Sequence, residues 1–86
     1  MTKEEVAERV RQSIADEVGM NISEITDDKR ILEDLDVDSL DTIEIVIELE
    51  DEFEFGEIPD YDAARWTTVG DVVEYIWGRV SEDSTK

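Results

Sequence analysis

Apolar positions recur at helical spacing in three stretches of the chain. In the first stretch, five apolar side chains fall within one third of a helical wheel turned by about 100° per residue. These five are Val6, Ala7, Val10, Ile14 and Val18. Thr2 followed by Glu5 forms a capping-box pattern, and Gly19 is typical of the position just beyond a helix end. The pattern predicts a first helix between the Thr2 cap and Gly19.

A long loop and a second helix follow. From Met20 to Val37 the periodicity is lost, but the segment is too apolar for a free linker, and we expect it to be pinned onto the core. Its apolar residues include Ile22, Ile25, Ile31, Leu32 and Leu35. Asp38 is a strong helix N-cap, and the second helix is predicted from there to about Glu54.

Two further helices are predicted after Gly56. Pro59 to Ala64 can form a short helix with Pro at its first position, and Thr68 with Asp71 begins a fourth helix that ends near Gly78 to Val80. The apolar stripe of the fourth helix contains Val69, Val72, Val73, Ile76, Trp77 and Val80. We therefore predict an all-α fold, a small antiparallel four-helix bundle with three main helices and one short one. It forms one domain over residues 1–80, followed by a flexible tail over residues 81–86.

The second helix has more apolar surface than one core face requires. Its expected core residues are Thr42, Ile45, Val46, Leu49 and Phe53. A second apolar stripe contains Leu40, Ile43 and Ile47, and an acidic ridge beside it contains Asp41, Glu44, Glu48 and Asp51. A helix wedged between neighbours on two sides would explain the second stripe. The alternative is a docking surface, in which apolar anchors lie beside carboxylates.

Composition and charge narrow the choice of partners. The chain has 26 acidic and 8 basic residues, and residues 31–64 contain 14 acids and no base. The formal charge of −18 repels nucleic acid and anionic membranes, so basic proteins are the expected partners. The absence of Cys and His excludes disulfides, thiolate and imidazole chemistry, and the usual zinc ligands. We expect a cytoplasmic location, since no apolar run is long enough for a signal core or a membrane span. We also expect the protein to be a monomer.

Ser39 stands at the predicted start of the second helix. Asp-Ser is a common helix opening, so a lone Ser at this place is more often a helix-start residue than a modified one. A phosphate ester on Ser39 would nevertheless lie at a helix N-terminus, where backbone N–H groups and the helix dipole favour an anion.

The run Leu35-Asp36-Val37-Asp38-Ser39-Leu40-Asp41-Thr42-Ile43-Glu44 is similar to the attachment-site motif of acyl carrier proteins. Further likeness, in order and approximate spacing, is found at Glu50-Asp51-Glu52-Phe53, Ile58-Pro59-Asp60, Thr67-Thr68-Val69 and Tyr75-Ile76, so it covers nearly the whole chain. The resemblance implies covalent 4′-phosphopantetheine on Ser39 and a carrier of acyl thioesters, most simply in fatty acid biosynthesis. It implies a protein that is not an enzyme.

The resemblance also implies the binding residues and partners. Asp38 is the acid beside the attachment serine that takes part in recognition by the phosphopantetheinyl transferase. Together with the ridge residue Glu48, the partner-binding residues are Leu40, Asp41, Glu44, Ile47, Glu50 and Asp51. The other partners are acyl-transfer and synthase enzymes with basic surfaces, and no nucleic acid, membrane insertion or metal is expected.

Three features depart from the family pattern. Asp36 stands where the family often has Gly, and Asp tolerates a left-handed turn better than most residues. The segment from Phe53 to Ile58 is one residue longer than usual. Trp66 replaces a smaller aliphatic residue beside the implied acyl pocket, so the last two departures bear on chain length and pathway.

Other functions are compatible with parts of the sequence. The same motif can serve a polyketide or another specialised acyl pathway. A different class is an acidic interaction module that mimics polyanions through residues 31–64 and needs no modified serine. A calcium loop from Asp36 to Asp41 lacks the Gly at its sixth position and the Glu at its twelfth, where Ile47 stands. Paired carboxylates of an enzyme are formally possible, but no Asp or Glu spacing is distinctive.

Overall fold

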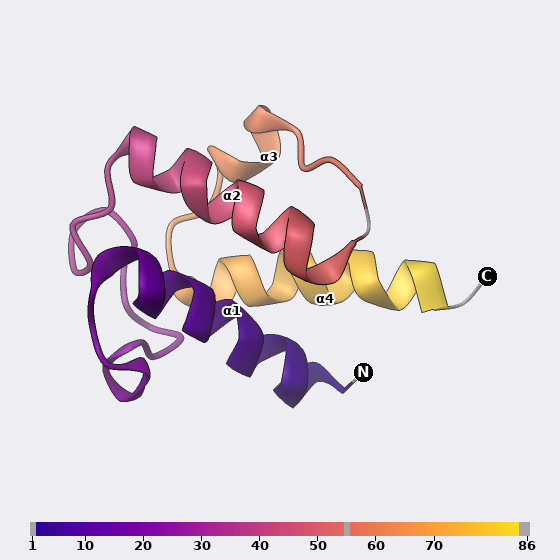
Figure 1. Ribbon diagram of the computed structural model, residues 1–86, viewed down its shortest axis with the longest axis horizontal. Helices are drawn as coiled ribbons and strands as arrows, with labels where there is room; N and C mark the ends of the chain where they lie inside the picture. The colour runs from indigo at the N-terminus through magenta and orange to yellow at the C-terminus, as the bar shows by residue number, and fades with distance from the viewer. Residues whose placement is uncertain (1, 55, 85–86) are drawn as a thin grey trace.

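The structure, a computed structural model, describes residues 2–54 and 56–84 and is helical throughout its regular parts (Figure 1). The helices are α1 (Lys3–Val18), α2 (Ser39–Phe53), α3 (Asp60–Ala63) and α4 (Val69–Ser84), with a single 3-10 turn at Ile22–Glu24. Figure 1 shows α1 antiparallel to α2 and α4, which run in the same direction because residues 56–68 return along the bundle. The predicted all-α bundle of three main helices and one short helix is confirmed.

Local signals in the sequence set both ends of α1. The Thr2 hydroxyl accepts a hydrogen bond from the Glu5 N–H, and the Glu5 carboxylate accepts one from the Thr2 N–H. At the other end Gly19 adopts a left-handed conformation with φ 73°, and its N–H donates to the Ala15 carbonyl. The capping box and the terminal glycine therefore act as predicted.

The shorter helix and the last one differ slightly from prediction. Pro59 is the N-cap of α3 rather than its first residue. α4 starts at a Thr68–Asp71 capping box as expected, but it ends at Ser84 instead of near Gly78 to Val80. Beyond Gly78 the chain has no Gly or Pro to stop the helix. Residues 85–86 of the predicted tail lie outside the described residues, and its flexibility stays a prediction.

The loop between α1 and α2 is fastened to the rest of the molecule by its backbone. The Ile31 N–H donates to the Thr67 carbonyl at 2.9 Å, and the Val69 N–H donates to the Lys29 carbonyl at 3.0 Å. These two bonds flank an isolated antiparallel bridge between Arg30 and Thr68. The end of the loop, and with it the start of α2, is thereby held beside the connection between α3 and α4.

Apolar side chains of this loop pack against the core, with one exception. Ile25 and Leu35 are buried, and Ile22 and Ile31 are partly buried against the core. Leu32 is 67% exposed, so its predicted place in the core is wrong. The Leu35 N–H bonds to the Arg30 carbonyl in a turn that directs Ile31 and Leu35 inward and leaves Leu32 on the outer side.

One hydrophobic core joins the helices, and α1 packs against both α2 and α4. The largest fully buried side chains are Val6, Val10, Ile14, Ile25, Val37, Leu49, Ile58, Val69, Val72 and Ile76. The predicted inward face of α2 is confirmed by Ile45, Val46 and Leu49, which are buried, and by Thr42 and Phe53, which are partly buried. No helix in the described part of the chain is long and apolar enough to cross a lipid bilayer.

Candidate functional site at the start of α2

The N-terminus of α2 is capped by Asp38. Its backbone is extended, and its carboxylate accepts a hydrogen bond from the Asp41 N–H at 2.9 Å. The Thr42 hydroxyl and N–H both donate to the Asp38 carbonyl. An N-cap residue has a non-helical backbone, so the helix cannot extend to Asp38. Ser39 is therefore the first helical residue.

The Ser39 side chain is exposed, and its hydroxyl makes no hydrogen bond within the described residues. The backbone N–H groups of Ser39 and Leu40 also have no acceptor there, since they precede the first hydrogen-bonded turn. Two open donors beside an exposed hydroxyl suit a phosphate group bonded to that oxygen. The site therefore fits a phosphate-linked arm on Ser39.

Asp36 sets the direction from which the chain enters this helix. Its φ is 55°, the left-handed conformation that the sequence led us to expect. Val37 then turns inward and is almost completely buried, whereas Asp38 and Ser39 stay at the surface. A left-handed Asp followed by a buried Val thus presents the serine at the end of the loop.

A groove of about 920 Å³ opens beside Ser39. Ser39 and Thr42 line it from α2, and Arg30 and Glu33 line it from the loop. Apolar side chains that line it include Ile31, Ile43, Val46, Ile58, Ala63 and Trp66. An apolar groove that begins at an exposed serine can hold an apolar chain attached to that serine.

The second apolar stripe of α2 faces outward. Leu40, Ile43 and Ile47 are 66%, 53% and 57% exposed. The interpretation of α2 as a helix wedged on two sides is therefore wrong, because no neighbouring element covers this stripe in the described structure. The exposed stripe is compatible with the docking interpretation, which stays a prediction.

Some carboxylates of the acidic ridge face solvent, and others lie against α1. One carboxylate oxygen each from Glu17, Asp41 and Glu44 lies within 4.8 Å of the other two. A hydrogen bond to Glu44, followed by burial and the negative charges of Glu44, Asp41 and Glu48, raises the pKa of Glu17 to about 7. Glu17 was missed from the sequence because only the packing of α1 on α2 brings it there. Of the acidic residues in the calcium-loop alternative, Asp41 belongs to this cluster, whereas Asp36 and Asp38 do not.

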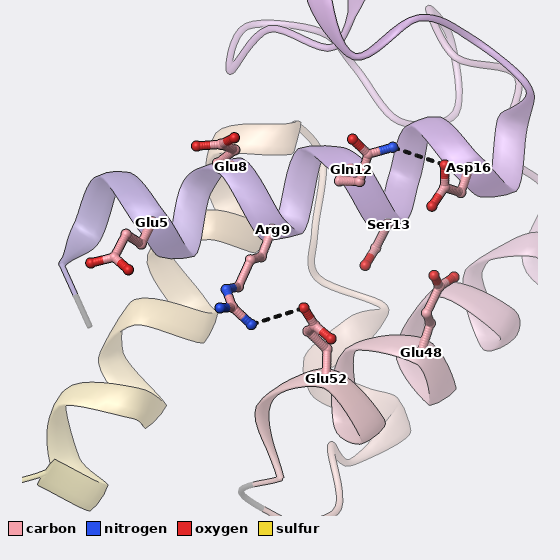
Figure 2. Close-up of a pocket in the computed structure, with 8 residues that line it drawn as sticks. All are labelled: Glu5, Glu8, Arg9, Gln12, Ser13, Asp16, Glu48 and Glu52. Atoms are coloured by element: carbon pink, nitrogen blue, oxygen red, sulfur yellow. Dashed lines mark hydrogen bonds and ion pairs between the residues drawn. The ribbon is translucent and has the colours of Figure 1, made fainter.

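Glu48 lies farther along α2 and faces α1. Figure 2 shows it opposite Asp16 and Ser13, beside an ion pair of 3.0 Å between Arg9 and Glu52. Burial, and then the charges of Asp16 and Glu52, raise the pKa of Glu48. Glu48 is only partly exposed. Among the ridge residues, the more open positions are therefore Glu44 and Asp51.

Glu50 has a structural contact that the sequence did not indicate. Its carboxylate accepts a hydrogen bond from the Ile58 N–H at 2.6 Å, and it lines the groove. This bond ties the segment after α2 back onto the helix, so that Ile58 is buried. A role of Glu50 in partner binding stays a prediction.

Trp66 lies between α3 and α4 and lines the groove. Its ring contacts Tyr75 edge to face, with the ring centroids 5.5 Å apart. Its Nε1 atom is buried without a hydrogen-bond acceptor in the described structure. The sequence marked Trp66 as unusual for the family, but only the fold shows that its polar atom is unpaired.

Comparisons with known proteins agree with this geometry. The sequence profile of the family described as phosphopantetheine attachment site matches residues 8–76. The chain is 46% identical over 76 residues to an acyl carrier protein of Exiguobacterium sp. (strain ATCC BAA-1283 / AT1b), covering 88% of this chain and 95% of that protein. It is also similar to a solved structure of acyl carrier protein from Enterococcus faecalis, with a TM-score of 0.75 and 42% identity over 92% of this chain and 99% of that one.

Proposed function

This chain belongs to the acyl carrier protein family, and we propose that Ser39 is the residue to which its covalent 4′-phosphopantetheine is attached. The arm supplies a terminal thiol, on which acyl groups are carried as thioesters. The protein's own residues hold and present the cargo and make no bonds in it, so the proposed role is that of a carrier and not of an enzyme. The proposed pathway is fatty acid biosynthesis.

The placement of Ser39 carries this proposal. Its hydroxyl is exposed at the first position of α2, next to the open N–H groups of Ser39 and Leu40 and at the edge of the groove. The donors can hold a phosphodiester, and the Asp38 cap keeps the helix start in place. Apolar groove walls can shield an acyl chain from water.

The proposed partners are the phosphopantetheinyl transferase and acyl-handling enzymes with basic surfaces. They would meet the exposed stripe of Leu40 and Ile47 and the neighbouring carboxylates of α2. Opposite charge speeds encounter, and apolar contact holds the complex. The cytoplasmic location and the monomeric state expected from the sequence stay predictions.

The attachment is tested by intact mass after incubation with coenzyme A and a phosphopantetheinyl transferase. We expect the wild-type protein to gain the mass of one arm and Ser39→Ala to gain none. Ser23→Ala is the matched control, since Ser23 is also exposed but lies in the 3-10 turn, and it should be modified like the wild type. Mass gain by Ser39→Ala would place the arm elsewhere.

The same measurement separates the carrier from the acidic interaction module, which needs no modification. A wild-type protein that never gains the arm would favour that module. The pathway is tested on the loaded protein, by asking whether fatty acid synthase enzymes elongate its acyl group. Failure of elongation on a loaded protein would favour a polyketide or other specialised pathway.

A further inference from the structure

Trp66 is held firmly in its place at the groove. It packs against Tyr75 at an interplanar angle of 67°. The Tyr75 hydroxyl donates to an Asp62 carboxylate oxygen at 2.8 Å and accepts from Arg79 Nη1 at 2.9 Å. This chain of hydrogen bonds links α3 to α4, and the Arg79 guanidinium also lies 5.9 Å from the centre of the Tyr75 ring. The partners of Tyr75 therefore fix the ring against which the indole rests.

The indole N–H of Trp66 lacks an acceptor in this setting. A donor that is closed off from water and unpaired is unfavourable, and most buried polar groups in proteins are paired. The groove beside Trp66 is lined by apolar side chains such as Ile31 and Val46 and by oxygen-bearing side chains such as Thr42 and Thr67, but none of the described residues accepts a hydrogen bond from Nε1. Because Nε1 is covered in this structure, an oxygen atom on an entering chain could supply the missing acceptor once the chain parts the groove walls around the indole.

The occupant of the groove is constrained by Ser39. Ser39 and Trp66 line the same groove, so a chain tethered to Ser39 can reach the indole. A saturated acyl chain would bury apolar surface there but would leave the N–H unpaired. An acyl chain that carries a hydroxyl or keto oxygen would bury similar surface and could also accept a hydrogen bond.

On the basis of the proposed carrier function, we propose that Trp66 is a specificity residue whose indole N–H favours oxygen-bearing acyl groups, such as 3-hydroxyacyl or 3-oxoacyl chains. A fully saturated chain of the same length is bound less well inside the groove. The ring limits the space for a chain, and its N–H selects among the chains that fit. This preference belongs to intermediates of acyl elongation rather than to the finished saturated chain.

The proposal is tested on four forms of the protein loaded at Ser39: the bare arm, octanoyl, 3-hydroxyoctanoyl and 3-oxooctanoyl. The first measurement is the proton shift and exchange rate of the Trp66 indole N–H in protein labelled with ¹⁵N. The second is the melting temperature. We expect the oxygen-bearing forms to move the indole proton downfield and slow its exchange, and to melt about 4–8 °C above the octanoyl form, the shift of one recovered hydrogen bond in a domain of this size.

Trp66→Phe keeps an aromatic ring and removes the N–H, so it should abolish the difference between the octanoyl and oxygen-bearing forms. Trp77→Phe is the matched control, because Trp77 is partly buried on α4 and does not line the groove, and it should preserve the difference. If Trp66→Phe folds poorly, the indole signal of the wild type still decides the question.

Four results would overturn the proposal, and the last of them would overturn the carrier function too. An indole proton already shifted downfield by the bare arm would mean that an amide carbonyl of the arm is the acceptor. An upfield proton unaffected by any acyl group would mean that the N–H rests on the Tyr75 ring. Equal melting temperatures for the octanoyl and oxygen-bearing forms would remove the specificity while leaving the carrier function intact. A wild-type protein that never gains the arm would overturn the carrier function as well.

Discussion

Within the stretch of residues 36–39, Asp36, Asp38 and Ser39 each have a different structural role. Asp36 turns the chain through a left-handed conformation, Asp38 caps α2, and Ser39 presents its hydroxyl. The left-handed turn costs an L-residue about 1–2 kcal/mol, and glycine is largely spared this cost. Asp36 is thus a strained residue beside the proposed attachment site.

We predict that Asp36→Gly keeps or raises the free energy of unfolding, by up to about 1 kcal/mol, because relief of strain offsets the greater freedom of the unfolded chain. Asp36→Val should lower it by about 1–2 kcal/mol, since a β-branched residue is still less tolerant of this turn. Urea unfolding measures both changes. Glu57→Gly, at an exposed residue without positive φ, is the control and should lose about 0.5–1 kcal/mol. If the wild type and Asp36→Val were equally stable, the claim that residue 36 is strained would be wrong.

Helix α2 has two apolar faces, one in the core and one in solvent. Ile45, Val46 and Leu49 bury one face in the core, and Leu40 and Ile47 leave an apolar stripe in solvent. Exposed apolar side chains beside carboxylates are typical of a transient docking surface. The same helix can therefore hold the fold together and receive a partner.

We predict that reversal of Glu44 and Asp51 together to Lys slows association with the transferase by about tenfold at low salt and flattens its salt dependence. These carboxylates are exposed, so each alone should matter little, about 0–1 kcal/mol. Stopped-flow association rates across a salt series measure the effect. Reversal of Glu4 and Glu8 on α1 makes the same change in net charge and should leave most of the rate intact. Equal slowing by both pairs would show that net charge alone governs encounter.

Ile47→Ala tests the apolar half of the same surface. We predict about 1 kcal/mol weaker binding, roughly fivefold, and expect it in the dissociation rate, because short-range contact is lost while the charge is kept. The variant should fold normally, since Ile47 is 57% exposed. An unchanged dissociation rate would mean that the stripe is not part of the interface.

At the scale of the whole molecule, negative charge is the dominant property. The formal charge is −18, and the side chains of ion pairs such as Arg9 with Glu52 remain partly open to solvent. Exposed pairs contribute little, so most of the repulsion is uncompensated. Carboxylates come close together where α1 meets α2, at Glu17, Asp41 and Glu44.

We predict that the free energy of unfolding falls as pH rises from about 5 to 8. The pKa of Glu17 is raised in the folded state to about 7 from an ordinary 4.5, so the folded protein holds that proton more tightly. The resulting stabilisation is complete below the ordinary pKa and is lost as pH rises through about 7. Glu17→Gln should reduce this fall, as measured by urea unfolding at each pH.

Glu57→Gln, at an exposed loop carboxylate outside the cluster, is the control and should keep the wild-type pH dependence. Asp71 acts in the opposite sense, because hydrogen bonds from the N–H groups of Thr67 and Thr68 lower its pKa. The stability that the Asp71 carboxylate contributes is lost only as pH falls below about 4, which lies outside the pH range of the test. Identical pH profiles for Glu17→Gln and the wild type would refute the role of Glu17.

Features that depend only on neighbouring residues could be predicted from the sequence alone. The capping boxes at Thr2 and Thr68 and the Asp38 cap follow from local backbone chemistry, and the structure has each of them where it was predicted. The left-handed Asp36 was expected from the Gly that the resembled family often has at this position. Apolar periodicity gave the helices and their inward faces for the same reason, since positions three and four apart share one side of a helix. The end of α4 was missed because no residue there marks a stop.

Properties that depend on which distant segments meet are visible only in the folded protein. Leu32 and Ile31 are adjacent and equally apolar, and only the turn fixed against α4 decides that one is exposed and the other packed. Glu17 meets Glu44, and Trp66 meets Tyr75, across the packing of separate helices. Exposure, altered pKa and an unpaired N–H are properties of such contacts, and a linear pattern cannot specify them because it does not fix the three-dimensional neighbours.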